Sequence, residues 1–424
     1  MRVFSELNFK TLRAAAAALL ASCAALGFSS CSDGESAVAV LWTDRPEFAF
    51  YAELFNATQD RYRVEVYHRD FPARAVRDAR KPPDIVVASW LRGAETRAFF
   101  APLDDLVYGE GALEYAFYSG LLAGGNFGGT QYLLPVSFNA PLAVFARGNS
   151  PALSGPLAVG LEEMKALGQN FNARAAGAFT RMGFSPTWDD DFLFVMATLL
   201  GASFAEANPV AWDSGALAGA GDFAREWIAG ANMGVQDSGH FEFRFFTIPP
   251  ESMILSGRIF FAYMDSARFF TIAEDRRRGL DFRWIAERDA IPVAESAVYL
   301  GIAQGSRSPA ADAFVRWFFR ADTQLALLER SHKFRQMETS FGVAGGFSAL
   351  RAVTEQFFPG FYPELLGALP PEDFFVPANA LPSDWAAMKR QVVVPYLRER
   401  AEGAADATIP LESRVADWAR LNRF

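Results

Sequence analysis

The strongest constraint on the fold is an alternation of apolar runs and helical segments within residues 38–88. Residues 38–42 are unbroken apolar sequence and indicate a buried strand. Pro46 opens a segment with a helical apolar stripe, and residues 62–67 then alternate as a strand does. Residues 85–88, after a Pro-Pro-Asp stop, form another apolar run. The order strand, helix, strand, helix, strand predicts a parallel sheet with helical crossovers, so we expect an α/β fold.

Polar and aromatic side chains follow two of these strands. Ligands of parallel sheets bind beyond the carboxyl ends of the strands, where neighbouring strand exits converge. We therefore expect Trp42 and Trp90 to face one cleft, and at least one of the two rings to stack on a ligand. The candidates at the two strand exits are Trp42, Asp44, Arg45, Ser89, Trp90 and Arg92.

Three further positions place an aromatic ring beside a polar group. Rings stack on the apolar face of a sugar, and Asp, Asn or Arg groups bond to its hydroxyls, so such pairs fit a site for a small polar ligand. The alternative for each ring is a place in the core, and for each charge a place in solvent. These candidates are Phe138 with Asn139, Trp188 with Asp189, and Tyr263 with Asp265.

Three consecutive carboxylates occupy residues 189–191. A calcium loop spaces its ligands alternately around a glycine turn, which this run lacks. We favour helix capping by Asp191 together with solvated charge, and contact between Asp189 and ligand is the alternative.

The amino terminus has the pattern of an export signal. A basic head is followed by an apolar, small-residue run that ends before Cys31 and a polar stretch. A cysteine at that point resembles a bacterial lipobox, whose thiol is acylated. Cys23 has the better box by residue type, but Cys31 leaves a longer apolar core and a polar tether, so we favour Cys31. An uncleaved membrane anchor is the remaining alternative.

Composition argues against several classes of function. The net charge is −9 with no basic stripe, which makes binding of nucleic acid a poor expectation. Both cysteines lie in the first 31 residues and the three histidines are scattered, so we expect no cofactor and no metal site. The motifs of serine hydrolases, zinc proteases and nucleotide-binding loops do not occur, so we expect no enzyme.

Fragments spread along the chain, in order, resemble family 1 extracellular solute-binding proteins, the sugar and oligosaccharide type. The chain departs from that family's pattern at residues 161–164 and 251–253, as a divergent member would. The fragments that resemble it are residues 83–86, 102–107, 131–135, 143–145, 161–164, 201–204, 251–253 and 305–311.

The resemblance implies a two-lobed periplasmic-binding-protein fold. Each lobe would be a mainly parallel sheet flanked by helices, and hinge strands would cross between the lobes near residues 137–141 and 289–295. The expected division is a signal peptide at 1–30, a tether at 31–36, lobe one at 37–140 and 294–345, and lobe two at 141–293 and 346–424.

The implied function is capture of a small polar ligand, a sugar or oligosaccharide by expectation, through hinge closure of the two lobes, for an ABC importer. The protein would be an exported monomer, anchored by lipid at the membrane and delivering its ligand to permease subunits. Two alternatives stay open: a sensor or structural lipoprotein that kept the fold without transport, and a secreted enzyme acting on glycans.

Overall fold

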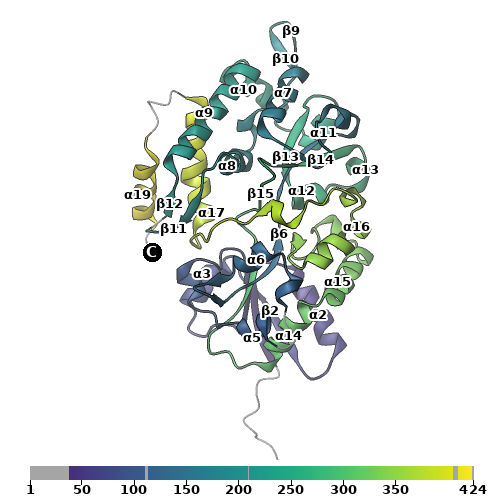
Figure 1. Cartoon of the computed structure of the whole chain (residues 1–424), viewed down its shortest axis with the longest axis vertical. Helices are drawn as coiled ribbons and strands as arrows, with labels where there is room; N and C mark the ends of the chain where they lie inside the picture. The colour runs from purple at the N-terminus through teal and green to yellow at the C-terminus, as the bar shows by residue number, and fades with distance from the viewer. Residues whose placement is uncertain (1–37, 110–112, 209, 404–408, 423–424) are drawn as a thin grey trace, which may run out of the picture.

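The computed structural model describes residues 38–109, 113–208, 210–403 and 409–422, which form two lobes stacked end to end (Figure 1). The predicted signal peptide, Cys23, Cys31 and the tether lie outside these residues. The two lobes of sheet and helix confirm the predicted α/β class.

A six-stranded sheet forms the centre of lobe one. β1 pairs in parallel with β2 and β3, as the sequence predicts, but β16 is antiparallel to β3 and β6, and β17 is antiparallel to β6. The sheet is therefore mixed rather than mainly parallel, because β16 enters from the hinge and runs against the strands that end there. The strand order is β17 (Phe347–Ser348), β6 (Leu134–Phe138), β16 (Val298–Ile302), β3 (Ile85–Ala88), β1 (Val38–Thr43) and β2 (Arg63–His68).

Aromatic side chains pack two helices of lobe one against each other. Phe48 and Phe55 of α2 meet Phe318 and Phe314 of α14, with ring centroids 5.3 Å apart in both pairs. Edge and tilted ring contacts of this kind stabilise beyond the area that they bury. The larger helices of this lobe are α2 (Glu47–Thr58), α3 (Pro72–Asp78), α14 (Pro309–Phe318) and α15 (Ala321–Lys333).

Lobe two is built on a four-stranded sheet that is mainly antiparallel, which corrects the expected parallel sheet. β7 runs against both of its neighbours, and only β14 and β8 are parallel. The reason is again the hinge: β7 enters the lobe from it, while β13 and β14 return toward it. The order is β13 (Phe261–Asp265), β7 (Pro141–Ala146), β14 (Leu280–Ile285) and β8 (Ala158–Val159).

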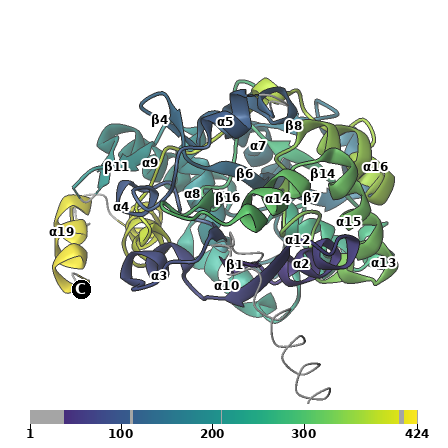
Figure 2. The same cartoon turned by 90° about the horizontal axis from the view of Figure 1, so that it is seen from below.

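Helices and small hairpins complete lobe two. In the view from below, α19 lies on the same side of the molecule as α3 and α4 of lobe one (Figure 2). Further elements of the two lobes, of which α4 belongs to lobe one, are α4 (Ala94–Arg97), α7 (Leu161–Phe171), α8 (Asp190–Leu199), β11 (Phe204–Glu206), β12 (Val210–Trp212), α9 (Ser214–Ala231), α10 (Val235–Phe245), α12 (Ser266–Phe270), α13 (Glu274–Arg277), α16 (Phe358–Phe361), α17 (Trp385–Met388), α18 (Val394–Glu402) and α19 (Leu411–Leu421).

The chain crosses between the lobes three times. The first crossing joins β6 to β7, and the second joins β14 to β16 through β15 (Ile291–Pro292); both fall where the sequence predicted them. A third crossing, which the sequence analysis missed, leads from β17 through β18 (Phe375–Val376) to α17, and β15 and β18 pair in parallel. β17 also belongs to the first sheet, two residues past the expected end of lobe one at 345, because it pairs with β6.

An apolar seam joins the lobes along one edge of the hinge. The ring of Phe270 stacks on Phe341 at 4.7 Å, and the indole of Trp284 meets Phe347 at 5.8 Å. The indole nitrogen of Trp284 donates to the carbonyl of Ala368 at 2.6 Å. No helix within the described ranges is long and apolar enough to cross a membrane.

We expect the Arg277–Glu364 ion pair in this seam to contribute measurably to stability. Its Nε–Oε1 distance is 2.7 Å, and the two side chains are only 9% and 13% exposed. Replacing Glu364 by Ala leaves a buried guanidinium without its partner, which should lower the free energy of unfolding by about 2–4 kcal/mol. Glu274→Ala, which breaks the exposed Glu274–Arg278 pair, is the matched control. Equal urea midpoints for the two variants would contradict the expectation.

Candidate functional site

A cavity of about 660 Å³ lies between the lobes. Its walls come from α8, the ends of β11 and β13, all three crossings and the start of the π-helical turn at Lys389–Val393. Lobe one contributes Trp90 beyond the end of β3. This volume fits a ligand of a few sugar-sized units rather than a single small ion.

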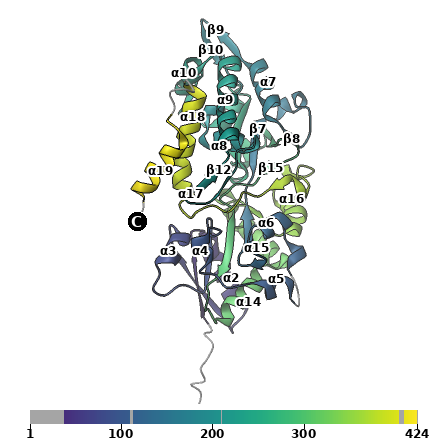
Figure 3. The same ribbon diagram turned by 60° about the vertical axis from the view of Figure 1, so that its left-hand side comes forward.

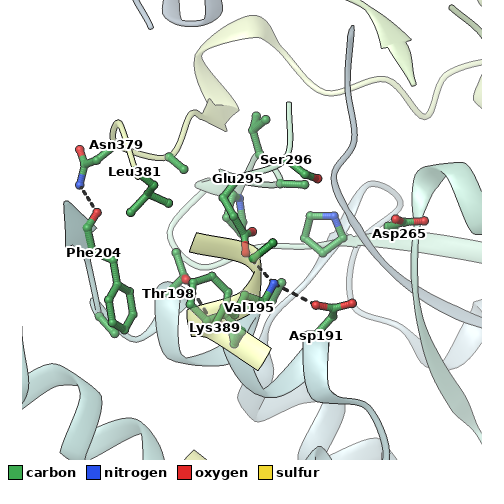
Figure 4. A pocket seen from close by; sticks show the side chains of 18 of the residues that line it. Asp191, Val195, Thr198, Phe204, Asp265, Glu295, Ser296, Asn379, Leu381 and Lys389 are labelled. Atoms are coloured by element: carbon green, nitrogen blue, oxygen red, sulfur yellow. Dashed lines mark hydrogen bonds and ion pairs between the residues drawn. The ribbon is translucent and has the colours of Figure 1, made fainter. Parts of the chain in front are cut away.

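A lysine paired with two carboxylates lies at the centre of the cavity wall (Figure 4). The Nζ atom of Lys389 is 2.5 Å from Oε1 of Glu295 and 2.9 Å from Oδ1 of Asp191. Burial alone would lower the pKa of Lys389, but Glu295 and Asp191 outweigh it, and the pKa is raised. The three groups come from the 389–393 turn, the second crossing and the first turn of α8, so the ammonium holds separate segments together.

Four aromatic rings line the same cavity: Trp90, Phe194, Phe204 and Tyr263. Trp90 packs against hydrophobic clusters of both lobes. Its backbone has φ = 66°, a left-handed conformation that is rare for a bulky residue. Such local strain gathers at functional sites, where the surrounding structure holds the residue in place.

Asp265 lies at the cavity edge where β13 ends. Its carboxylate accepts the backbone N–H of Arg268 at 2.7 Å and so caps α12. Burial raises the pKa of Asp265, an effect that the hydrogen bond opposes. Burial also raises the pKa of the nearby Tyr263 phenol, as do the charges of Asp191 and Asp265. The phenol is therefore a neutral donor at physiological pH.

The structure brings three of the predicted site residues to the cavity wall: Trp90, Tyr263 and Asp265. Trp42 is not among the lining residues. It lies within β1, and the guanidinium of Arg69 covers its ring at 4.6 Å. The expectation that Trp42 and Trp90 face one cleft is therefore wrong for Trp42.

The polar candidates at the two strand exits form ion pairs and hydrogen bonds with other groups of the chain, and they do not line the cavity. Asp44 pairs with Arg45 at 3.2 Å, and a nitrogen of Arg45 donates to the hydroxyl of Ser89 at 2.8 Å. Ser89 in turn donates to the carbonyl of Ser296 at 2.5 Å. Arg92 donates to the carbonyl oxygens of Gly124 and Ala378, both at 2.8 Å, and so fastens the third crossing.

Phe138 and Asn139 have structural roles at the first crossing. Phe138 is 1% exposed and meets the ring of Phe375 at 5.1 Å. The side-chain amide of Asn139 donates to the carbonyl of Gly345 at 2.8 Å and accepts from the hydroxyl of Ser266 at 2.6 Å. Its polar atoms are thus occupied within the hinge.

Trp188 and Asp189 also serve the fold. The ring of Trp188 stacks on Phe241 at 5.7 Å. Asp189, and not Asp191 as predicted, caps α8, since its Oδ1 accepts from the backbone nitrogens of Asp191 and Phe192. Asp191 is consequently free to pair with Lys389.

The sequence analysis missed Lys389, Glu295, Phe194 and Phe204. All four lie on segments that reach the cavity only because of the hinge and the third crossing. One signal was present: lysine is rare in this chain, and Lys389 lies three residues before an apolar run at 392–394. Among the described residues, no group of three or more His, Cys, Asp or Glu side chains is placed to hold a metal ion.

Comparison with known proteins identifies the fold. No protein-family model and no curated protein matches the chain. Among solved structures, the chain is similar to the cyclic α-maltosyl-1,6-maltose binding protein of Arthrobacter globiformis, at 16% identity and a TM-score of 0.59, over 90% of this chain and 97% of that one. It is also similar to an ABC substrate-binding protein of Listeria monocytogenes in complex with cycloalternan. Identity is 12% and the TM-score 0.59, over 91% of this chain and 99% of that one.

A third similar structure is the maltose/maltodextrin-binding domain of Bdellovibrio bacteriovorus bound to maltotriose. Identity is 13% and the TM-score 0.56, over 90% of this chain and 100% of that one. These similarities confirm the two-lobed fold that the sequence resemblance implies.

We expect the Asp265→Asn variant to change how stability depends on pH. The pKa of Asp265 is raised, so between the ordinary aspartate value of about 3.9 and its native value the folded chain binds more protons than the unfolded chain. Stability therefore falls as pH rises through this window. Asparagine caps a helix as well as aspartate but has no charge. The urea midpoint of Asp265→Asn relative to wild type should be higher at pH 6.5 than at pH 3.5.

Asp213→Asn is the reference variant for this comparison. Asp213 caps α9 through the N–H of Ala216 but is exposed and outside the cavity. An identical pH trend in the two variants would show that the cavity does not cause the effect.

Proposed function

We propose that the chain is the solute-binding protein of an ABC importer and that it binds an oligosaccharide between its lobes. The observation that supports this most directly is the cavity at the crossings, which is lined by aromatic rings together with carboxylates and a neutral phenol. Rings stack on the apolar face of a pyranose, and acceptors bind its hydroxyls. Two of the similar structures are named for binding maltose, maltodextrin or a cyclic maltosyl-maltose, and the third is a substrate-binding protein in complex with cycloalternan.

Binding without turnover is part of the proposal. The similar structures are binding proteins rather than enzymes. Of the cavity carboxylates, Glu295 and Asp191 both pair with Lys389, Asp190 pairs with Arg398 at 2.8 Å, and Asp265 accepts the N–H of Arg268 as the cap of α12. Carboxylates committed to ion pairs are poorly suited to act as general acid and base on a glycosidic bond.

We also propose that the protein is exported, lipid-anchored at the membrane and a partner of permease subunits. The support is the amino-terminal sequence, in which an apolar run precedes Cys31. The lobes would comprise residues 37–140 with 294–348, and 141–293 with 377–424, joined by the three crossings.

The central test is titration with defined sugars. We expect maltotriose, mannotriose or a cyclic glucan to stabilise the protein against heat, by about 2.7 kcal/mol at a concentration one hundred times its dissociation constant. Trp90→Ala should weaken that binding by about 1–3 kcal/mol, because the stacked ring is lost. Calorimetric titration measures both quantities.

Trp42→Ala is the matched control, since Trp42 is a partly exposed tryptophan outside the cavity. Its affinity for the same sugar should equal that of wild type. Equal losses in the two variants would exclude a specific role for Trp90, and the absence of any stabilising sugar from a broad panel would contradict the proposed function.

The proposed anchor has a test of its own. We expect acylation at Cys31, because the apolar run extends to residue 28 and polar residues follow the cysteine. Mass spectrometry of the amino-terminal peptide from the membrane fraction identifies the modified residue. An acylated Cys23, or an intact signal segment, would contradict this choice.

A further inference from the structure

The lobes also meet at a place distant from the aromatic seam, where α4 of lobe one lies against β11 of lobe two. Both carboxylate oxygens of Glu206, the last residue of β11, accept the backbone N–H of Ala94, at 2.7 and 2.9 Å. The guanidinium of Arg97 lies 3.6 Å from the same carboxylate. Figure 3 shows α3 and α4 facing the lobe that carries α17 and α19. We call these three residues the clasp.

The strand that carries Glu206 is held in place from its own lobe. Its backbone N–H donates to the carbonyl of Ala380 at 2.9 Å, and the side-chain amide of Asn379 donates to the carbonyl of Phe204 at 3.0 Å. β11 is thereby fixed to the third crossing. A side chain presented by a rigid strand loses little conformational freedom when it binds, so its hydrogen bonds count more fully.

The two lobes touch closely beside the clasp. A Cβ atom added at Gly93 would lie 3.0 Å from the carbonyl oxygen of Leu381 and 3.4 Å from Oε1 of Glu206. Gly93 has φ = −60° and ψ = 145°, which any residue adopts, so glycine is needed here for space and not for backbone geometry. A larger side chain would separate the lobes at this edge.

We propose that the clasp favours the closed arrangement of the lobes even when no ligand is bound, and that Glu206 is its positioning residue. A hydrogen bond to a carboxylate that exists only in the closed state shifts the equilibrium between open and closed forms toward closed. A larger fraction of the protein is then already in the form that binds the ligand, so the apparent affinity for a ligand of the closed form rises. The inference rests on the proposed binding of a ligand between the lobes and on the expected hinge closure, but it does not depend on which sugar binds.

The test measures the distance between the lobes without ligand. Asp78 at the end of α3 and Ala416 on α19 are exposed, and each can be changed to Cys for spin labelling. Replacing Cys23 and Cys31 by Ser leaves the labels as the only thiols, because no other cysteine occurs in the chain. Glu206→Ala should raise the fraction of long interlobe distances about tenfold, the change expected for one charge-assisted hydrogen bond.

Glu287→Ala is the matched control. The carboxylate of Glu287 accepts the N–H of Leu161 at the start of α7 at 2.7 Å, the same kind of contact but within lobe two. This variant should leave the distance distribution unchanged. Gly93→Val provides a second route to the open form without altering charge, and it should lengthen the distance in the same direction as Glu206→Ala.

Thermal melts establish that each variant is folded. Folded Glu206→Ala and Gly93→Val proteins with the wild-type distance distribution would overturn the proposal, as would an equal shift in Glu287→Ala. If Glu206→Ala does not fold, the distance distribution of Gly93→Val alone decides whether the proposal holds. A shift in distance together with failure of every sugar to bind would support the clasp and contradict the proposed ligand class.

Discussion

The two lobes can enclose a cavity only if three stretches of chain cross between them side by side, and Asn139 ties these stretches together. Its amide binds the carbonyl of Gly345 and the hydroxyl of Ser266, and its backbone oxygen accepts the N–H of Ala294 at 2.8 Å. Polar groups removed from water must find partners, so these bonds determine how far the first crossing lies from the second and from the chain that leads to the third. Because the cavity walls are built on the crossings, their positions depend on these bonds of Asn139 together with the pairing of β15 and β18.

The charge at the cavity wall follows from that geometry. Lys389 is 16% exposed, and an ammonium so far removed from water is costly without partners. Its partners Glu295 and Asp191 come from the second crossing and from α8, which the hinge brings within reach. With these charges paired, what the cavity offers a ligand is rings, hydroxyls, partly used acceptors and the guanidinium of Arg390. Such a surface suits a neutral polyhydroxylated ligand better than a strongly charged one.

The alternation of apolar runs was sufficient to predict the α/β class and the parallel pairing of β1 with β2 and β3, and the family resemblance implied the first two crossings. It could not predict which strand-exit side chains reach the cavity. Trp42 lies within β1, where the neighbours Leu41 and Thr43 are buried on the opposite face. Trp90 lies two residues beyond β3, where a left-handed backbone directs its ring to the cleft. The residues of the third crossing were beyond prediction, because long-range packing alone decides where they lie.

The two contact edges between the lobes differ in chemistry, and this difference indicates how the lobes move. Along the seam, the rings of Phe270 and Trp284 are 1% and 0% exposed. Separating them from lobe one would expose their apolar surface to water, at a free-energy cost of about 25 cal/mol per Å². At the clasp, water can replace the partners of Glu206 when the lobes separate. The net loss of stabilising free energy there is therefore about 1–3 kcal/mol. We therefore expect the polar edge to separate first while the aromatic edge stays packed. In that case the lobes would rotate about the seam, and the cavity would open on the side where α4 meets β11.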